Sequence, residues 1–182
     1  MKTKLLILDV DGTLTDGSIT YGDVVELKTF NAKDGLILKA LPKLGIEVIF
    51  LTGRKSEAVA RRAAELGAEA VQCVDDKLTV LKSILTGRGI APEQCAYIGD
   101  DLNDYAAMSI CGFKACPNDA VAEIRGICDY VSQKKGGHGA VREICEVMLK
   151  RDNVYQRLLR LNSAHPASFA YYASHYSSAQ TD

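Results

Sequence analysis

The sequence lacks a strong excess of charge of either sign and any long apolar run. Among its 182 residues the formal net charge is only −1, which gives no reason to expect binding to nucleic acid or to an anionic membrane surface. The longest apolar runs fall far short of a membrane span. The run behind the initial MKTK is too short for a signal peptide and has no small-residue cleavage site behind it. We therefore expect a cytoplasmic protein whose partner is a small solute.

The sequence also lacks paired cysteine motifs, because its six cysteines form no CxxC pair and no disulfide-framework spacing. They are scattered through apolar stretches, so we expect reduced residues of the core. With 47% hydrophobic residues the chain can bury a substantial core, and its length suits one domain better than two. The cysteines are Cys73, Cys95, Cys111, Cys116, Cys128 and Cys145.

Short apolar segments alternate with segments of helical period along most of the chain. The first apolar run, residues 4–10, predicts a strand buried on both faces. Further strands are expected at 47–52, 71–74, 95–99 and 114–116, and helices at 36–44, 56–66, 77–86 and 104–110. This order predicts an α/β fold with a doubly wound, mainly parallel sheet and helices on both faces. Ligands bind such sheets beyond the carboxyl ends of the strands.

Two segments depart from this alternation. Residues 16–30 alternate loosely and contain turn glycines, which predicts a β-hairpin excursion. Near the end, a glycine-rich loop precedes a predicted amphipathic helix from about Ala140 to Leu161, and the final stretch shows no convincing period. We therefore expect one domain at 1–150, followed at 151–182 by the end of a helix and a flexible tail.

Five carboxylates lie at or just after the ends of predicted strands: Asp9, Asp11, Asp100, Asp101 and Asp104. Converging there, they would repel one another unless a cation lay among them. Oxygen-only ligation indicates magnesium, and a bound metal also lets a carboxylate attack a phosphate. We predict Asp9 as the nucleophile. Asp11, two residues further on, is placed to protonate the leaving alcohol and later to activate water as general acid and base.

Two further residues complete a predicted phosphoryl-transfer site. Thr52 ends the second strand, so its hydroxyl and the backbone N–H of Gly53 are placed to hold a phosphoryl oxygen. Lys77, at a predicted helix start, would offset charge on the nucleophile and the transferring group. The aspartates and Lys77 each have a plainer alternative. An Asp after a strand is often a turn or N-cap residue, and a Lys at a helix start is usually solvated.

These motifs resemble those of the haloacid dehalogenase superfamily of phosphatases. LDVDGTLTDG, the TGR at 52–54, Lys77 and YIGDDLND match its four motifs in order. The resemblance implies an aspartyl-phosphate on Asp9, with magnesium bound by Asp9, the backbone carbonyl of Asp11, and Asp100. Asp101 and Asp104 would be supporting groups.

A narrower resemblance covers roughly residues 4–150. DGSITYGDVVELKTFNAKDG, TGRKSEAVARRAAELG and GGHGAVREICEVML are similar to segments of the capless 3-deoxy-D-manno-octulosonate 8-phosphate phosphatases. This implies a sugar-acid phosphate substrate and a homotetramer assembled by the hairpins, in which a neighbouring subunit closes each active site. The sequence agrees, because it has no long insertion after Asp11 or between Gly53 and Asp100 from which to build a cap domain. The tail after Asn153 departs from the family pattern.

By position, the resemblance also implies a set of substrate-binding residues. Arg54 and Arg62 match basic residues that receive the sugar acid, and an arginine can hold a carboxylate with two hydrogen bonds. The alternative for Arg62 is a solvated helix residue, and His138 on the glycine loop is taken as a surface histidine. The segment implied to contact substrate comprises Asn31, Lys33, Asp34 and Gly35.

Two other functions stay open at this point. Relatives with the same motifs hydrolyse sialic-acid-type nonulosonate 9-phosphates, and some of those carry an acidic residue where this chain has Arg54, which favours the octulosonate. A different class is a non-catalytic binding domain that keeps the fold. Such a domain could have lost Asp9 or Asp11, and both are present.

Overall fold

The computed structural model describes residues 2–21 and 26–163. At its centre is a six-stranded sheet in the order β5-β4-β1-β6-β7-β8, in which every neighbouring pair is parallel. This confirms the predicted doubly wound α/β architecture. The strands are β1 (Leu5–Leu8), β4 (Glu47–Leu51), β5 (Glu69–Val71), β6 (Cys95–Ile98), β7 (Phe113–Cys116) and β8 (Tyr130–Val131).

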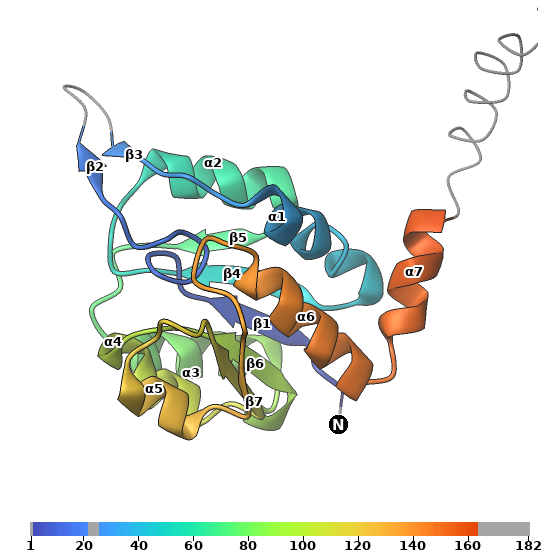
Figure 1. Cartoon of the computed structure of the whole chain (residues 1–182). Helices are drawn as coiled ribbons and strands as arrows, with labels where there is room; N and C mark the ends of the chain where they lie inside the picture. Colours follow the sequence, from blue (N-terminus) through green and yellow to red (C-terminus); the bar gives the residue numbers. More distant parts are fainter. Residues whose placement is uncertain (1, 22–25, 164–182) are drawn as a thin grey trace, which may run out of the picture.

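Helices cover both faces of the sheet (Figure 1). Along β1, Leu6 and Leu8 pack with α1, α2 and α6, whereas Leu5 and Ile7 pack with α3, α4 and α5. All four side chains of β1 are fully buried, which explains why this strand is a continuous apolar run rather than an alternating one. The helices are α1 (Ala32–Leu38), α2 (Glu57–Leu66), α3 (Lys77–Arg88), α4 (Leu102–Ser109), α5 (Ala122–Ile127), α6 (Ala140–Arg151) and α7 (Tyr155–Ser163).

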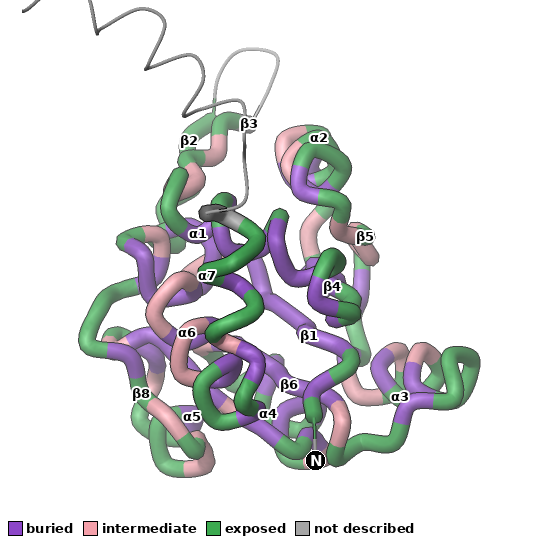
Figure 2. The backbone as a smooth tube through the Cα atoms, turned by 90° about the vertical axis from the view of Figure 1, so that its right-hand side faces the viewer, coloured by how far each residue is buried: buried purple, intermediate pink, exposed green. Residues whose placement is uncertain are grey.

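The central strands end at nearly the same level. Leu8 of β1 is paired with Phe50 of β4 on one side and with Ile98 of β6 on the other. The residues that follow these strands therefore lie side by side at one edge of the sheet. Figure 2 shows these central strands in the purple of buried residues, so the edge stands on a rigid, closely packed base.

Two predicted boundaries of regular structure were wrong. The helix expected at 36–44 begins earlier, at Ala32, because Asn31 caps it by accepting a 2.9 Å hydrogen bond from the Lys33 N–H. It ends at Leu38, and a separate 3₁₀ turn (Pro42–Leu44) follows, since Pro42 has no N–H with which to continue an α-helix. The strand expected at 71–74 is instead β5, and Cys73 beyond it has a positive φ of 59°. Of the six cysteines predicted to lie in the core, only Cys73 is exposed, so the prediction was wrong for that residue. Cys128 is half-buried and packs against the core, and the other four are buried.

The predicted hairpin is present as the antiparallel pair β2 (Thr20–Tyr21) and β3 (Glu26–Leu27), separate from the central sheet. Figure 1 shows it beyond the strand ends, on the same side of the molecule as the start of α2. No other insertion interrupts the described α/β core, which agrees with the predicted absence of a cap domain.

The single helix predicted from Ala140 to Leu161 is two helices, α6 and α7. They are separated at Asn153, which has a positive φ of 57°. The preceding Asp152 accepts a 2.7 Å hydrogen bond from the Thr3 N–H, so a contact with the start of the chain fixes the break.

The predicted flexible tail lies for the most part outside the described residues. Within 2–21 and 26–163, none of the helices combines the length and apolar character that a membrane crossing requires.

Candidate active site

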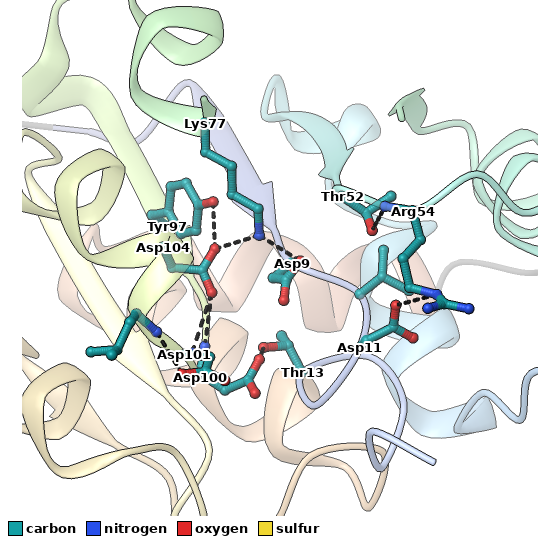
Figure 3. A network of polar contacts seen from close by, with 12 residues as sticks. Asp9, Asp11, Thr13, Thr52, Arg54, Lys77, Tyr97, Asp100, Asp101 and Asp104 are labelled. Carbon is teal, nitrogen blue, oxygen red and sulfur yellow. Dashed lines mark hydrogen bonds and ion pairs between the residues drawn. The ribbon is translucent and has the colours of Figure 1, made fainter. Parts of the chain in front are cut away.

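Polar residues from five elements meet at the carboxyl edge of the sheet (Figure 3). Asp9 follows β1, Thr52 follows β4 and Asp100 lies two residues after β6, as the strand register requires. Lys77 is the first residue of α3, a helix that Asp76 caps by accepting a 3.0 Å hydrogen bond from the Thr79 N–H. Asp104 lies in the first turn of α4. The sheet and two helix starts therefore converge on one small volume.

Lys77 lies between two carboxylates. Its Nζ is 2.7 Å from Asp9 Oδ1 and 2.7 Å from Asp104 Oδ1, and all three side chains are buried. Burial alone lowers the pKa of Lys77, but the charges of Asp9 and Asp104 and their hydrogen bonds outweigh it and raise the pKa. The ammonium therefore stays protonated and fixes the orientation of Asp9, so Lys77 is not a solvated helix residue.

Asp104 is a scaffold carboxylate, because donors occupy both of its oxygens. Oδ1 accepts from Lys77 and, at 2.8 Å, from the hydroxyl of Tyr97. Oδ2 accepts from the backbone N–H of Asp100 at 3.1 Å and of Asp101 at 3.5 Å. Asp101 itself caps α4 by accepting a 2.7 Å hydrogen bond from the Leu102 N–H. Both supporting residues thus hold the loop that carries Asp100.

The site has the ligating oxygens and the excess of negative charge that a cation site requires. Carboxylate oxygens of Asp9, Asp100 and Asp104 lie within 4.8 Å of one another. Burial and the charge of Asp104 raise the pKa of Asp9 to about 6, and burial and the charge of Asp9 raise the pKa of Asp100 to about 8. A divalent cation relieves both effects. Since donors occupy both oxygens of Asp104, the carboxylates suited to ligate the cation directly are Asp9 and Asp100.

The loop after Asp9 is shaped around Asp100. Thr13 donates a 2.8 Å hydrogen bond from its hydroxyl to Asp100 Oδ1. Gly12 has a positive φ of 90°, and a Cβ there would be 2.0 Å from Asp100 Oδ2. Glycine at this position therefore lets the backbone approach the carboxylate closely.

Asp11 lies nearer to the mouth of the site than Asp9. Its side chain is 21% exposed, whereas that of Asp9 is 8% exposed. Its Oδ1 is bonded to Lys28 Nζ, and its Oδ2 is 3.9 Å from Arg54 Nε. Thr52 lies beside this group, and its hydroxyl accepts a 3.3 Å hydrogen bond from the Arg54 N–H across Gly53. Figure 3 shows Asp11 on the side of Thr52 and Arg54.

The other predicted substrate-binding residues lie on α1 and α2. Asn31 bonds through its amide nitrogen to the carbonyl of Gly137 at 3.3 Å, and Lys33 is exposed. Asp34 is buried and accepts a 2.7 Å hydrogen bond from the Arg142 N–H of α6. The structure therefore brings Asp34 to a helix start rather than to the carboxylate cluster.

Arg62 lies over Gly35, where a Cβ would be 2.1 Å from the arginine Nη2. Its guanidinium is 5.8 Å from the centre of the Phe30 ring and 2.9 Å from a carboxylate oxygen of Glu65. It lines a cavity of about 360 Å³ beside the hairpin, lined by Lys28, Phe30, Ala32, Ala58, Arg61, Arg62 and Glu65. Because Lys28 reaches both this cavity and Asp11, the cavity adjoins the mouth of the site.

Sequence reasoning missed three residues of this network: Thr13, Lys28 and Tyr97. Thr13 and Tyr97 lie inside the motifs that were recognised, so their proximity to the aspartates was a signal for both. Lys28 comes from the end of the hairpin and meets Asp11 across 17 positions of sequence. No local pattern marks that contact.

Three features occur together here: an aspartate after the first strand of a parallel sheet, a buried Lys–Asp pair, and a second acidic loop after β6. This combination defines an aspartate-based hydrolase of the haloacid dehalogenase type. The sequence profile of haloacid dehalogenase-like hydrolases matches residues 73–144. The 3-deoxy-D-manno-octulosonate 8-phosphate phosphatase of Escherichia coli (strain K12) is 43% identical over 148 residues, which is 80% of this chain and 79% of that protein. The chain belongs to this family of phosphatases.

Solved structures of this family share the fold of this chain. The 3-deoxy-D-manno-octulosonate 8-phosphate phosphatase of Moraxella catarrhalis, in complex with magnesium ion, phosphate ion and KDO, superposes with a TM-score of 0.84 at 43% identity. The superposition covers 87% of this chain and 92% of that one. The cobalt-bound enzyme of Haemophilus influenzae gives a TM-score of 0.80 at 36% identity, over 85% and 91% of the two chains.

Proposed function

We propose that this protein is a magnesium-dependent phosphatase that hydrolyses 3-deoxy-D-manno-octulosonate 8-phosphate to 3-deoxy-D-manno-octulosonate and phosphate. The observation that carries this proposal is the buried triad in which Lys77 lies 2.7 Å from both Asp9 and Asp104. It orients one aspartate at a strand end, beside a second carboxylate that is suited to a cation. Such an arrangement supplies a nucleophile and the charge stabilisation that phosphoryl transfer requires.

In the first half of the reaction an oxygen of Asp9 attacks the phosphorus. The bond from phosphorus to the sugar oxygen breaks, and that oxygen takes a proton from Asp11. In-line attack places the leaving oxygen on the side of the phosphorus away from Asp9. That side is the mouth of the site, where the partly exposed Asp11 lies. The aspartyl-phosphate then holds the phosphoryl group on Asp9.

In the second half, a water oxygen attacks the same phosphorus. Asp11 accepts the proton of that water, and the electron pair of the bond between phosphorus and Asp9 returns to the carboxylate. Lys77 lies 2.7 Å from both Asp9 and Asp104, so it is placed to stabilise the regenerated carboxylate. Thr52 and the N–H of Gly53 are proposed to hold a phosphoryl oxygen at the end of β4.

Magnesium would be held by Asp9, Asp100 and the backbone carbonyl of Asp11, and when bound it neutralises the phosphoryl oxygens and favours in-line geometry. The fit rests on the raised pKa values of Asp9 and Asp100, which burial and neighbouring carboxylates cause, and on the close approach of the backbone to Asp100 that Gly12 allows. Thr13 supports this arrangement by orienting Asp100.

The sugar acid is proposed to bind at the mouth, with Arg54 and Arg62 facing its carboxylate. Arg54 lies 3.9 Å from Asp11, and Arg62 lines the adjoining 360 Å³ cavity. An arginine recognises a carboxylate through two parallel N–H donors. The proposed substrate-contacting segment comprises Asn31, Lys33, Asp34 and Gly35, and of these Lys33 is exposed.

We also propose a homotetramer assembled through the β2–β3 hairpin, with a neighbouring subunit closing each active site. The hairpin supports this, because Ile19, Tyr21 and Leu27 are 42%, 77% and 60% exposed. Large apolar side chains gathered on one exposed element indicate a surface that another chain covers. Sedimentation velocity of the full chain tests the assembly, and cell fractionation tests the proposed cytoplasmic location.

The function is tested by phosphate release from 3-deoxy-D-manno-octulosonate 8-phosphate, nonulosonate 9-phosphates and common sugar phosphates, with magnesium and with EDTA. We expect metal-dependent turnover that is fastest with the octulosonate and is abolished by Asp9→Asn. Faster turnover of a nonulosonate 9-phosphate would identify that compound as the substrate and leave the proposed mechanism unchanged. If the wild type released no phosphate from any of these compounds, the phosphatase proposal would fall.

A further inference from the structure

Lys28 places a buried ammonium directly against Asp11. Only 1% of the Lys28 side-chain surface is exposed, and its Nζ is bonded to Asp11 Oδ1. A charge removed from water in this way requires an opposite charge close by. Asp11 supplies one, so the pair is favoured by the burial of Lys28 and restrains the rotation of the Asp11 side chain.

The chemistry of the pair explains how Lys28 orients Asp11. A lysine ammonium has three N–H donors and no acceptor. It can only donate, so it bonds to an accepting oxygen of the Asp11 carboxyl group and restrains where that group lies. Arg54 lies on the other oxygen, with its Nε 3.9 Å away. Lys28 thus bonds to one oxygen of the group that would act as a base, and Arg54 faces the other.

We propose that Lys28 is a positioning residue that holds the Asp11 side chain in place for the second half of the reaction. This inference rests on the proposed phosphatase function. In that step the water oxygen bonds to phosphorus, one water proton moves to Asp11, and the bond between phosphorus and Asp9 breaks with its electron pair on Asp9. Lys28 takes no proton and touches no reacting atom. It sets the place from which Asp11 accepts the proton.

The position of Lys28 links this step to the hairpin. Lys28 is the residue directly after β3, so the path of the hairpin fixes where its side chain enters the site. Lys28 also lines the cavity that contains Arg61 and Arg62. A competing role is therefore direct contact with the substrate, and the experiment has to separate the two.

The test is rapid-mixing kinetics of Lys28→Met with 4-nitrophenyl phosphate and saturating magnesium. Methionine fills a similar volume without the charge. Nitrophenolate leaves without needing a proton, so the first half of the reaction does not depend on Asp11. We expect the variant to release one equivalent of nitrophenolate per active site within about twofold of the wild-type rate, and then to turn over about tenfold more slowly. Acid quenching during turnover should trap more phosphoprotein than in the wild type.

Two variants serve as comparisons. Lys28→Arg keeps a cation at the position and should recover most of the steady-state rate. Lys39→Met removes an exposed lysine that follows α1 and should leave both phases unchanged. Thermal unfolding of each variant checks that the fold is intact.

Three results would overturn the proposal. The first is a loss of the initial nitrophenolate release in parallel with the steady-state rate, which indicates damage to Asp9 or to the fold. The second is a raised KM with an unchanged kcat, which indicates substrate contact. The third is unchanged turnover. If the wild type hydrolyses 4-nitrophenyl phosphate but not the sugar-acid phosphates, the substrate assignment fails while Lys28 remains fully testable.

Discussion

The hydroxyl of Tyr97 donates a 2.8 Å hydrogen bond to the carboxylate of Asp104, and it does so to the same oxygen that accepts from Lys77. Tyr97 is fully buried in β6, so its hydroxyl cannot exchange this partner for bulk water. Asp104 is thereby fixed from the sheet, and Lys77 is fixed by Asp104. The orientation of Asp9 depends on this chain of contacts because Lys77 bonds to Asp9 as well.

Tyr97→Phe removes that hydroxyl and keeps the ring. We expect kcat to fall about five-fold with little change in KM, because the change loosens Lys77 without touching the substrate. Unfolding free energy should fall by about 1 kcal/mol. Tyr130→Phe is the matched control, since its hydroxyl also bonds to a carboxylate at 2.8 Å, that of Glu143, away from the site. An equal fall in kcat for both variants would contradict the prediction.

Lys77→Met leaves two buried carboxylates, Asp9 and Asp104, without their shared cation. We expect kcat to fall by at least about a hundredfold and the unfolding free energy to fall by about 3 kcal/mol. Urea unfolding in EDTA measures the second effect. The double variant Lys77→Met with Asp104→Asn removes one of the two charges and should regain part of the stability but none of the activity. Recovery of activity in the double variant would refute the role of Lys77.

Asp34 links α1 to the start of α6, because its carboxylate accepts the Arg142 N–H at 2.7 Å in the first turn of that helix. Side-chain acceptors at a helix start are stabilising. Asp34→Ala should therefore lower the unfolding free energy by about 2 kcal/mol. We expect KM to change less than in Arg54→Ala, since Asp34 is 1% exposed. A larger rise in KM for Asp34→Ala than for Arg54→Ala would instead indicate a direct role of Asp34 in substrate binding.

The sequence predicted the strand ends and their carboxylates because both depend on local patterns. An apolar run such as Leu5–Leu8 identifies a buried parallel strand, and the register of such strands brings the residues behind them to one edge. Asp9, Thr52 and Asp100 followed from that argument alone.

Contacts between distant segments were beyond local reasoning. Nothing near Asp34 indicates that it meets Arg142, 108 positions later, and the break between α6 and α7 depends on Asp152 meeting Thr3 at the other end of the chain. The helical period continues through residues 152–154, so the pattern predicted one helix. Tertiary hydrogen bonding overrode it.

The acidic pair Asp9 and Asp100 at the proposed metal site also makes stability depend on pH when magnesium is removed. Burial first, and then the charge of Asp104 for Asp9 and of Asp9 for Asp100, raise the pKa of Asp9 to about 6 and of Asp100 to about 8. In the unfolded chain both have ordinary values near 4. Between these limits the folded state binds more protons than the unfolded state, so the unfolding free energy falls as pH rises. The lowered pKa of Asp152 affects the unfolding free energy only below this pH window, and the raised pKa of Lys77 affects it only above the window.

In EDTA we therefore expect the melting temperature to fall by about 5 °C between pH 5.5 and pH 8.5. Saturating magnesium should raise it more at pH 8.5 than at pH 5.5, because the cation and the protons compete for the same carboxylates. Scanning fluorimetry at both pH values measures this, with Asp100→Asn as the control in which the slope in EDTA is flatter. A melting temperature that rises with pH in EDTA would show that folding does not raise the pKa of these carboxylates, and the electrostatic reason for a divalent cation at this site would then be lost.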